Sequence, residues 1–334
     1  MTFSPRLRFR YAKTIQRLVL VSLFAAVFVV APIRARAETI TIGLVGAVSA
    51  THWPIYVGLK QGYYAAADLK LATVFTLSSN ALVQQLAVGS LDAALSTGIV
   101  DPLYAIDKGA PIAVLRLEMV SPPYALVAKP TISSLRELKG KTIMVDGPKG
   151  ITRLYVERML AANGIKASEV EMLFAGATTA RFAALQAGAV DATILLPPFS
   201  FFAESAGFRT LGLSVDYTPE LPFTGAVVNR NWAMAHPAAL VGLIKAHNQS
   251  MAWFLDAANR EAAIDLMVDA THQKRDDVAR AYDFLGGRKF FDADGRVSRR
   301  RMNAMLAALR DLGDVTPGLD IDRLILPGVT QVTD

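Results

Sequence analysis

One stretch of this chain occurs twice, and this repetition constrains the fold more than any other feature. Residues 75–92 read FTLSSNALVQQLAVGSLD, residues 174–191 read FAGATTARFAALQAGAVD, and the two align without a gap. Each copy predicts a strand, a polar turn, a helix ended by Gly89 or Gly188, and a second strand opened by an aspartate. Two copies this far apart predict two similar α/β lobes rather than a solenoid. A ligand is expected in the cleft between such lobes.

The first 37 residues have the features of a secretion signal. Basic residues populate positions 6–17, an apolar run covers Leu18–Ile33, and Ala35-Arg36-Ala37 matches an A-x-A cleavage site. The run is shorter than the roughly 20 residues that span a bilayer, which disfavours the alternative of an uncleaved membrane anchor. No arginine pair is present there, so we expect the general secretory route, with cleavage after Ala37.

Removing such a signal changes the charge balance. The full chain holds 35 Lys and Arg against 29 Asp and Glu, and seven of the basic residues lie in the first 37 positions, which hold no acidic residue. The near-neutral remainder lacks the basic excess of a nucleic-acid-binding protein. The run Arg299-Arg300-Arg301 is expected on a solvated helix face. The chain has no cysteine, which excludes disulfides and a lipid-anchored mature end, so a free periplasmic protein is expected.

Strand and helix patterns alternate after the signal, as in an α/β sheet. The pattern over residues 124–128 is expected to complete the first sheet, and residues beyond 228 are mostly helical. Two proline-bearing segments, 121–130 and 216–225, are expected to cross between the lobes and act as a hinge. The expected division is a signal over residues 1–37, lobe 1 over residues 38–129, lobe 2 over residues 130–220, and a return to lobe 1 over residues 221–334.

Several segments, taken in order, resemble the periplasmic substrate-binding proteins of ABC importers. YVGLKQGYYAAADLKL, LAVGSLDAALSTG and DKGAPIAVL resemble the first lobe of the sulfonate, nitrate and taurine type, which includes thiamine-pyrimidine binders. LRELKGKTIMV, LAANGI and ALQAGAVDATILLPPF resemble its second lobe. The resemblance covers residues 39–255 and implies the type II periplasmic-binding fold, in which two Rossmann-like lobes are joined by a two-segment hinge. It also implies a small-molecule ligand between the lobes and an ABC permease in the inner membrane as partner.

In α/β sheets, ligands lie beyond the carboxyl ends of the strands, where helix N-termini present free N–H groups. This rule selects loops in both lobes, and apolar walls come from residues near Pro198 and from the crossover around Phe223. The candidate ligand-binding residues are Thr51, His52, Trp53, Ser78, Ser79, Asn80, Ser96, Thr97, Lys149, Gly150, Thr152, Thr178, Thr179, Arg181, Pro198, Phe199, Tyr217 and Thr224.

Each candidate also has a plainer structural interpretation. The hydroxyl and amide side chains at the two helix starts are good helix caps. Trp53 is also compatible with a place in the core, and His52 with a solvated loop. The four histidines are scattered without metal-ligand spacing, so we expect neither a metal nor another cofactor.

Lys149 and Arg181 lie in or near the first turn of helices that are expected to face the cleft, where the helix dipole disfavours a cation. An anionic ligand would offset that effect, whereas exposed cations that point away from the cleft need no ligand. The hypothesis is a small organic anion, bearing a sulfonate or a carboxylate, with an apolar or aromatic body against Trp53, Phe199 and Tyr217.

The favoured function is a non-enzymatic, monomeric solute receptor. A sensory protein that reports its ligand to a membrane partner would use the same cleft and stays open. An enzyme on the same fold is disfavoured, because the chain has no G-x-S-x-G, G-x-G-x-x-G or Walker-type loop. The related branch that makes the thiamine pyrimidine uses a cysteine-rich iron motif, and this chain has no cysteine.

Overall fold

The computed structural model describes residues 37–47 and 49–334. All of the predicted signal except Ala37 lies outside the described residues. Within the described part, no helix combines the length and the hydropathy needed to cross a membrane.

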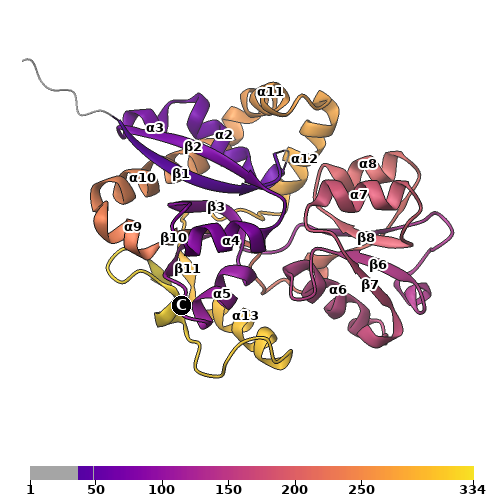
Figure 1. Cartoon of the computed structure of the whole chain (residues 1–334). Helices are drawn as coiled ribbons and strands as arrows, with labels where there is room; N and C mark the ends of the chain where they lie inside the picture. The colour runs from indigo at the N-terminus through magenta and orange to yellow at the C-terminus, as the bar shows by residue number, and fades with distance from the viewer. Residues whose placement is uncertain (1–36, 48) are drawn as a thin grey trace, which may run out of the picture. The chain divides into compact units, whose positions relative to one another are not determined.

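Two five-stranded sheets organise residues 38–334 (Figure 1). The first sheet has the order β2 (Leu69–Thr76), β1 (Glu38–Val45), β3 (Ala93–Gly98), β10 (Thr224–Asn229) and β4 (Ile112–Met119). The second has the order β7 (Glu171–Phe174), β6 (Thr142–Val145), β8 (Ala192–Leu195), β5 (Ala125–Ala128) and β9 (Arg209–Leu213). In the first sheet, β10 runs antiparallel to its neighbours β3 and β4; in the second, β5 runs antiparallel to its neighbours β8 and β9.

The two sheets have the same arrangement of strands, which confirms the two similar α/β lobes expected from the repeat. The aspartates that open the second strand of each repeat occupy equivalent places. Asp92 Oδ2 accepts a hydrogen bond of 2.7 Å from the backbone N–H of Thr41, and Asp191 Oδ2 accepts one of 3.1 Å from that of Thr142. Asp92 thereby ties the start of β3 to β1 in lobe 1, and Asp191 ties the start of β8 to β6 in lobe 2.

The chain crosses between the lobes earlier than expected. Strand β5 forms as predicted, but it pairs with β8 and β9, so its assignment to the first sheet is wrong. Lobe 1 therefore comprises residues 38–119 and 224–334, and lobe 2 comprises residues 125–213. The crossing segments are residues 120–124 and 214–223. Strand β10 returns the chain to the first sheet, as expected for the type II periplasmic-binding fold.

Helices cover the sheets and form most of the C-terminal third (Figure 1). Gly89 and Gly188 follow the two repeat helices with φ of 77° and 72°, a conformation that glycine adopts without a Cβ clash. Lobe 1 contains α2 (Trp53–Lys60), α3 (Tyr63–Ala66), α4 (Ser79–Ala87) and α5 (Val100–Asp107), and lobe 2 contains α6 (Ile151–Ala162), α7 (Thr178–Gln186) and α8 (Phe199–Ser205). The returning chain adds α9 (Arg230–Ala235), α10 (Pro237–Leu255), α11 (Arg260–Thr271), α12 (Arg275–Gly287), α13 (Arg299–Asp311) and α14 (Ile321–Leu324), with the short strands β11 (Val297–Ser298) and β12 (Val332–Thr333).

The crossing segments are tied to each other and to helix α13. Tyr124 N–H donates to Ser214 Oγ at 3.1 Å, which joins the two segments. Arg301 Nη1 donates to the carbonyl oxygens of Val120 at 2.6 Å and Pro219 at 2.7 Å, one in each segment. The expectation that the arginine run forms a solvated face is therefore wrong for Arg301, because its guanidinium is used to hold the two segments together.

Candidate functional site

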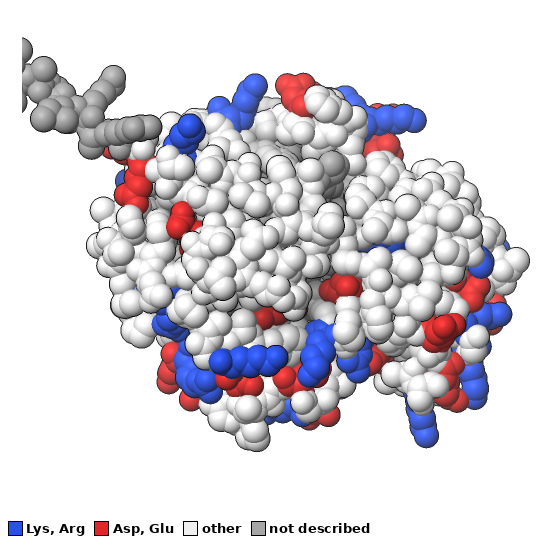
Figure 2. Space-filling model, viewed as in Figure 1, with Lys and Arg blue, Asp and Glu red and all other residues white. Residues whose placement is uncertain are grey.

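A cavity of about 480 Å³ lies between the two lobes and is lined by both. This is the size of typical small-molecule sites. Figure 2 shows the furrow between the lobes, with charged side chains gathered toward one end of it. The sequence-predicted residues that line the cavity are Thr51, His52, Ser78, Ser79, Asn80, Ser96, Lys149, Gly150, Thr178, Thr179, Arg181 and Phe199.

Three predicted apolar contacts lie elsewhere. Trp53 is fully buried in the core, where its ring centroid is 6.3 Å from that of Phe254. Tyr217 and Pro198 are also absent from the cavity lining. The aromatic lining comes instead from Phe199 and from two rings on the crossing segments, Tyr124 and Phe223, whose centroids are 4.9 Å apart.

Three predicted polar contacts lie behind the lining. Thr97 Oγ1 is 3.2 Å from Ser79 Oγ, and Thr152 Oγ1 donates to Asp146 Oδ1 at 2.7 Å. Thr224 Oγ1 accepts a hydrogen bond of 3.1 Å from the Met119 N–H. Thr97 and Thr152 thus position cavity residues rather than line the cavity themselves.

The N-termini of α4 and α7 both reach the cavity, and their first residues do not cap them. The α4 cap is Ser78, whose Oγ accepts from the Ala81 N–H at 3.2 Å. The α7 cap position is Ala177, which has no side-chain acceptor. The hydroxyls of Ser79 and Thr178 are therefore not used as helix caps. A helix N-terminus favours an anion through its free N–H groups and its dipole.

Arg181 is the cation of the cavity wall that carries no acidic partner within the described chain. Its side chain is only 1 % exposed, yet it belongs to none of the ion pairs. Its Nε donates to Ile194 O at 3.0 Å and its Nη2 to Thr178 Oγ1 at 3.0 Å, while Nη1 donates to two carbonyl oxygens of the preceding loop. These bonds orient the guanidinium but leave its charge uncompensated. A buried charge of this kind calls for a counter-charge.

Lys149 differs, because its charge is already matched. Its Nζ lies 2.6 Å from Oδ1 of Asp314, a carboxylate that follows α13, and 5.8 Å from the ring centroid of Tyr104. This ion pair joins lobe 2 to the returning chain at the cavity rim. Lys149 therefore serves the contact between the lobes, whether or not a ligand is present.

Two carboxylates that line the cavity are not among the residues predicted from the sequence. Asp101 lies in the first turn of α5 in lobe 1, and Asp146 follows β6 in lobe 2. Burial raises the pKa of the Asp101 carboxyl to about 6, and the negative charge of Asp146 adds to the effect, while a hydrogen bond with Ser79 opposes it. Both aspartates stand at carboxyl ends of strands, which is the signal that could have identified them.

His52 also lines the cavity and has an unused nitrogen. The residue is 1 % exposed, and its Nδ1 is buried without a hydrogen-bond partner. Burial lowers the pKa of the imidazole to about 4, although the charge of Glu118 opposes this. His52 is therefore neutral near pH 7, and its Nδ1 stays unsatisfied inside the wall of the cavity.

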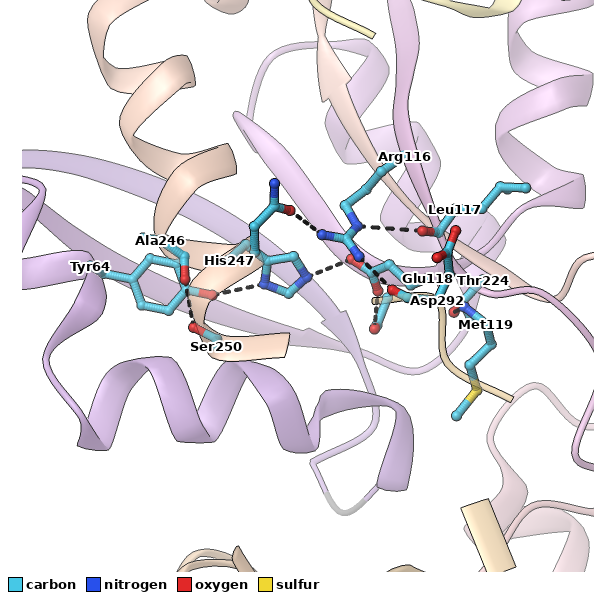
Figure 3. A network of polar contacts seen from close by, with 12 residues as sticks. Tyr64, Arg116, Leu117, Glu118, Met119, Thr224, Ala246, His247, Ser250 and Asp292 are labelled. Carbon is cyan, nitrogen blue, oxygen red and sulfur yellow. Dashed lines mark hydrogen bonds and ion pairs between the residues drawn. The ribbon is translucent and has the colours of Figure 1, made fainter. Parts of the chain in front are cut away.

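A buried polar network lies behind the cavity wall in lobe 1 (Figure 3). Ser96, which has a positive φ of 54°, donates its hydroxyl to Glu118. The other oxygen of Glu118 lies 2.7 Å from His247 Nε2, and Tyr64 Oη lies 3.0 Å from His247 Nδ1. Burial would raise the pKa of the Glu118 carboxyl, but His247, Arg116 and Ser96 together lower it. The network holds Ser96 in a backbone conformation that is unfavourable for serine.

The described residues contain no group of three or more His, Asp or Glu side chains placed to hold a metal ion. The arrangement is thus a pocket with helix N-termini, one unpaired guanidinium, two carboxylates and an aromatic wall. It is suited to binding a small polar molecule between two lobes.

Two lobes of this topology with a cleft between them form the periplasmic-binding-protein fold. Residues 49–260 match the family model described as NMT1/THI5 like, and the chain belongs to this family. A search of curated protein sequences gave no match.

Solved structures share the fold at low sequence identity. The alkanesulfonate-binding protein SsuA from Xanthomonas axonopodis pv. citri, bound to MOPS, is 19 % identical with a TM-score of 0.70, over 90 % of this chain and 100 % of that one. The periplasmic nitrate-binding protein NrtA from Synechocystis PCC 6803 is 15 % identical with a TM-score of 0.70, over 86 % of each chain. A DszB mutant in complex with biphenyl-2-sulfinic acid is 14 % identical with a TM-score of 0.64, over 88 % of this chain and 97 % of that one.

Proposed function

We propose that this chain is a periplasmic solute-binding receptor that captures a small organic anion between its lobes and delivers it to an ABC importer of the inner membrane. The solute carries a sulfonate or a carboxylate, and its body packs against the aromatic wall. The receptor acts as a monomer and releases the solute chemically unchanged. The predicted secretion signal supports export, and the family and the two-lobed fold support capture for import.

The unpaired guanidinium of Arg181 is the observation that carries this proposal. A buried cation in a ligand-sized cavity is stabilised when an anion binds, because Arg–anion hydrogen bonds are charge-assisted. The N-termini of α4 and α7 add N–H donors to the same cavity. An anion thus meets complementary groups from lobe 2 and from lobe 1.

The contacts of Ser96 and His247 support a binding role over a catalytic one. A serine nucleophile needs a base on its hydroxyl, and that base is usually a histidine. Here the Ser96 hydroxyl donates to Glu118, while both ring nitrogens of His247 contact other buried groups. The histidine is 1 % exposed and does not line the cavity.

The proposal is tested by a thermal-shift screen of the exported protein against sulfonates, aromatic carboxylates, nitrate and pyrimidines. A solute at about 100 times its Kd stabilises the fold by about 2.7 kcal/mol, which raises the Tm by several degrees. We expect a rise with at least one organic anion, and loss of that rise in Arg181→Gln. Arg136→Gln, an exposed position in the same lobe, is the matched control. A Tm that no anion raises, or a rise that survives in Arg181→Gln, contradicts the proposal.

A further inference from the structure

All ion pairs that join the two lobes, among the described residues, come from the C-terminal helices of lobe 1. These pairs are Arg280 with Glu204, Asp311 with Arg158, and Asp314 with Lys149. Their lobe 1 partners lie in α12, at the end of α13 or just after it, beyond residue 260, where the family match ends. Residues 38–47 and 49–119, the first segment of lobe 1, take part in no ion pair with lobe 2.

Helix α12 contacts helix α8 of lobe 2 through one arginine and one aromatic pair. Arg280 Nη2 lies 2.5 Å from Glu204 Oε2, and Arg280 Cζ lies 4.0 Å from the ring centroid of Phe201. The Phe201 ring also meets Phe284 of α12 edge-on, with the centroids 5.6 Å apart. A guanidinium over an aromatic face is attracted by the ring, and here a carboxylate adds to that attraction.

Helix α12 is fixed to lobe 1 by contacts of its own. Tyr282 Oη donates to Phe254 O in α10 at 2.7 Å, and Arg260 Nε at the start of α11 donates to Asp283 Oδ1 at 2.8 Å. These bonds tie α12 to the other helices of the returning chain. Its contact with α8 therefore joins one lobe to the other.

A second contact joins the end of α13 to helix α6 of lobe 2 and the loop before it. Lys149 Nζ lies 2.6 Å from Asp314 Oδ1, and Tyr104 Oη of α5 donates to Asp314 Oδ2 at 3.3 Å. Arg158 Nη2 of α6 lies 3.5 Å from Asp311 Oδ2. Since α5 belongs to lobe 1, the carboxylate of Asp314 is held by lobe 1 and reaches lobe 2. The two contacts thus meet lobe 2 at different helices, α8 and α6.

These contacts form without the help of a bound molecule. Of the residues that make them, only Lys149 lines the cavity. A rotation about the crossing segments that separates the lobes has to move α8 or α6 away from its partner helix. The contacts therefore favour the closed arrangement of this structure, in which both lobes line one cavity, over an open one.

We infer that α12 and α13 form a clamp that stabilises the closed arrangement independently of any solute. The clamp shifts the equilibrium between open and closed molecules toward closed molecules in the solute-free protein. Arg280 is its main residue on α12, because it meets both Glu204 and Phe201. The inference goes beyond the proposed function, since it holds whatever the cavity binds.

The test measures the distance between the lobes in the solute-free protein. The chain has no cysteine, so Val88→Cys and Ala187→Cys attach one spin label to each lobe. Both positions are exposed and lie outside the cavity lining. Double electron–electron resonance on the exported chain, freed of solute by exhaustive dialysis, gives the distribution of label distances.

The labelled chain is compared with Arg280→Met, Glu204→Gln and Arg280→Lys in the same background. Arg275→Met is the matched control, because Arg275 also lies in α12 but pairs with Glu261 and Asp265 of α11, within lobe 1. The Tm of each variant reports whether it is folded. Arg280 and Glu204 are partly exposed, so their substitution should leave the fold intact.

We expect the labelled chain to give mainly the distance that fits the closed arrangement. In Arg280→Met the ratio of closed to open molecules should fall roughly threefold to tenfold, because the ion pair and the cation–π contact are both lost. Glu204→Gln should shift the ratio in the same direction. Arg280→Lys keeps a cation for both partners and should restore most closed molecules, and Arg275→Met should match the labelled chain.

Two results would overturn the clamp. One is a labelled, solute-free chain that gives mainly longer distances than the closed arrangement allows. The other is a distribution for Arg280→Met that equals that for Arg275→Met. Neither result bears on the proposed function, which is tested separately by the rise in Tm with an organic anion.

Discussion

Leu77 and Gly176 hold the same position in the two copies of the repeat, and they lie against each other across the cleft. A Cβ built on Gly176 would come within 2.7 Å of the Leu77 carbonyl oxygen and 2.8 Å of Ser78 Cβ. Leu77 follows β2 in lobe 1, and Gly176 follows β7 in lobe 2. The repeat therefore supplies both walls of the cleft and the point at which they touch.

Substitution of Gly176 by valine should obstruct the approach of the lobes. The nearest atom is a backbone oxygen, which cannot move aside as a flexible side chain can, and overpacking of this kind costs about 1–3 kcal/mol. Ligand affinity is expected to fall roughly 5- to 150-fold. X-ray scattering should show a larger radius of gyration for the ligand-saturated variant than for ligand-saturated wild type.

The control for this substitution is Gly286→Ala, since a Cβ at Gly286 in α12 meets nothing within 4 Å. It should bind like wild type. Identical scattering and affinity for Gly176→Val and wild type would show that the contact of Gly176 with Leu77 does not limit closure.

Lys149 and Arg181 should respond differently to the same substitution. Replacing Lys149 with glutamine breaks an ion pair in which the lysine side chain is 59 % exposed and that of Asp314 is 7 % exposed, so the cost falls mainly on the stability of the fold. The affinity of Lys149→Gln for an anionic probe should therefore fall only a few-fold. Arg181→Gln should lose far more affinity for the same probe, because it removes a buried positive charge. Calorimetry with one sulfonate on both variants is decisive, and equal losses would contradict this division of roles.

Part of this contrast was accessible from sequence and part was not. Both cations were identified by their position near helix starts, which is a local property. Asp314, which neutralises Lys149, lies far along the chain, and no local pattern indicates that pairing. The same limit explains Trp53: its sequence position at the start of a helix fits a cleft wall, and only packing against Phe254 places it in the core.

The fold was more predictable than the site for a related reason. Strands, helices and their glycine ends are local signals, and the repeat let two lobes be inferred from one pattern. The pairing of β5 with β8 and β9 is long-range, so its sheet could not be assigned from the pattern of residues 125–128 alone. Asp101 and Asp146 carry a local signal, their position just beyond β3 and β6, but their meeting in one cavity from opposite lobes requires the assembled cleft.

Stability should depend on pH through Asp101. Its pKa is raised from 3.8 to about 6 in the folded chain, so the folded state binds more protons than the unfolded state between those values. This carboxyl therefore destabilises the fold near neutral pH, and the penalty disappears as the pH falls through 6 toward 3.8.

Ligand-free Asp101→Asn should accordingly have a higher Tm than wild type at about pH 7.5, and the difference should vanish near about pH 4. The measurement is the Tm difference between the two proteins as a function of pH, which cancels most other titrating groups. His52 should act in the opposite sense, because its pKa is lowered to about 4 and protonation then opposes folding. A pH-independent difference for Asp101→Asn would contradict the assignment of the shift to this residue.

Arg301 should control the stiffness of the hinge. Its guanidinium donates to Val120 O and Pro219 O, so one side chain from α13 holds both crossing segments. Replacing it with methionine leaves two carbonyl oxygens without this donor, at a cost of about 1–3 kcal/mol, and the Tm should fall by several degrees. Hydrogen exchange of the amides in residues 120–124 and 214–223 should accelerate, while amides of the β1 strand stay protected.

Arg300→Met changes the exposed neighbour in the same helix and should leave both measurements unchanged. If Arg301→Met and Arg300→Met behave alike, the crossing segments do not depend on this contact, and the stiffness of the hinge arises from their own pairing through Tyr124 and Ser214.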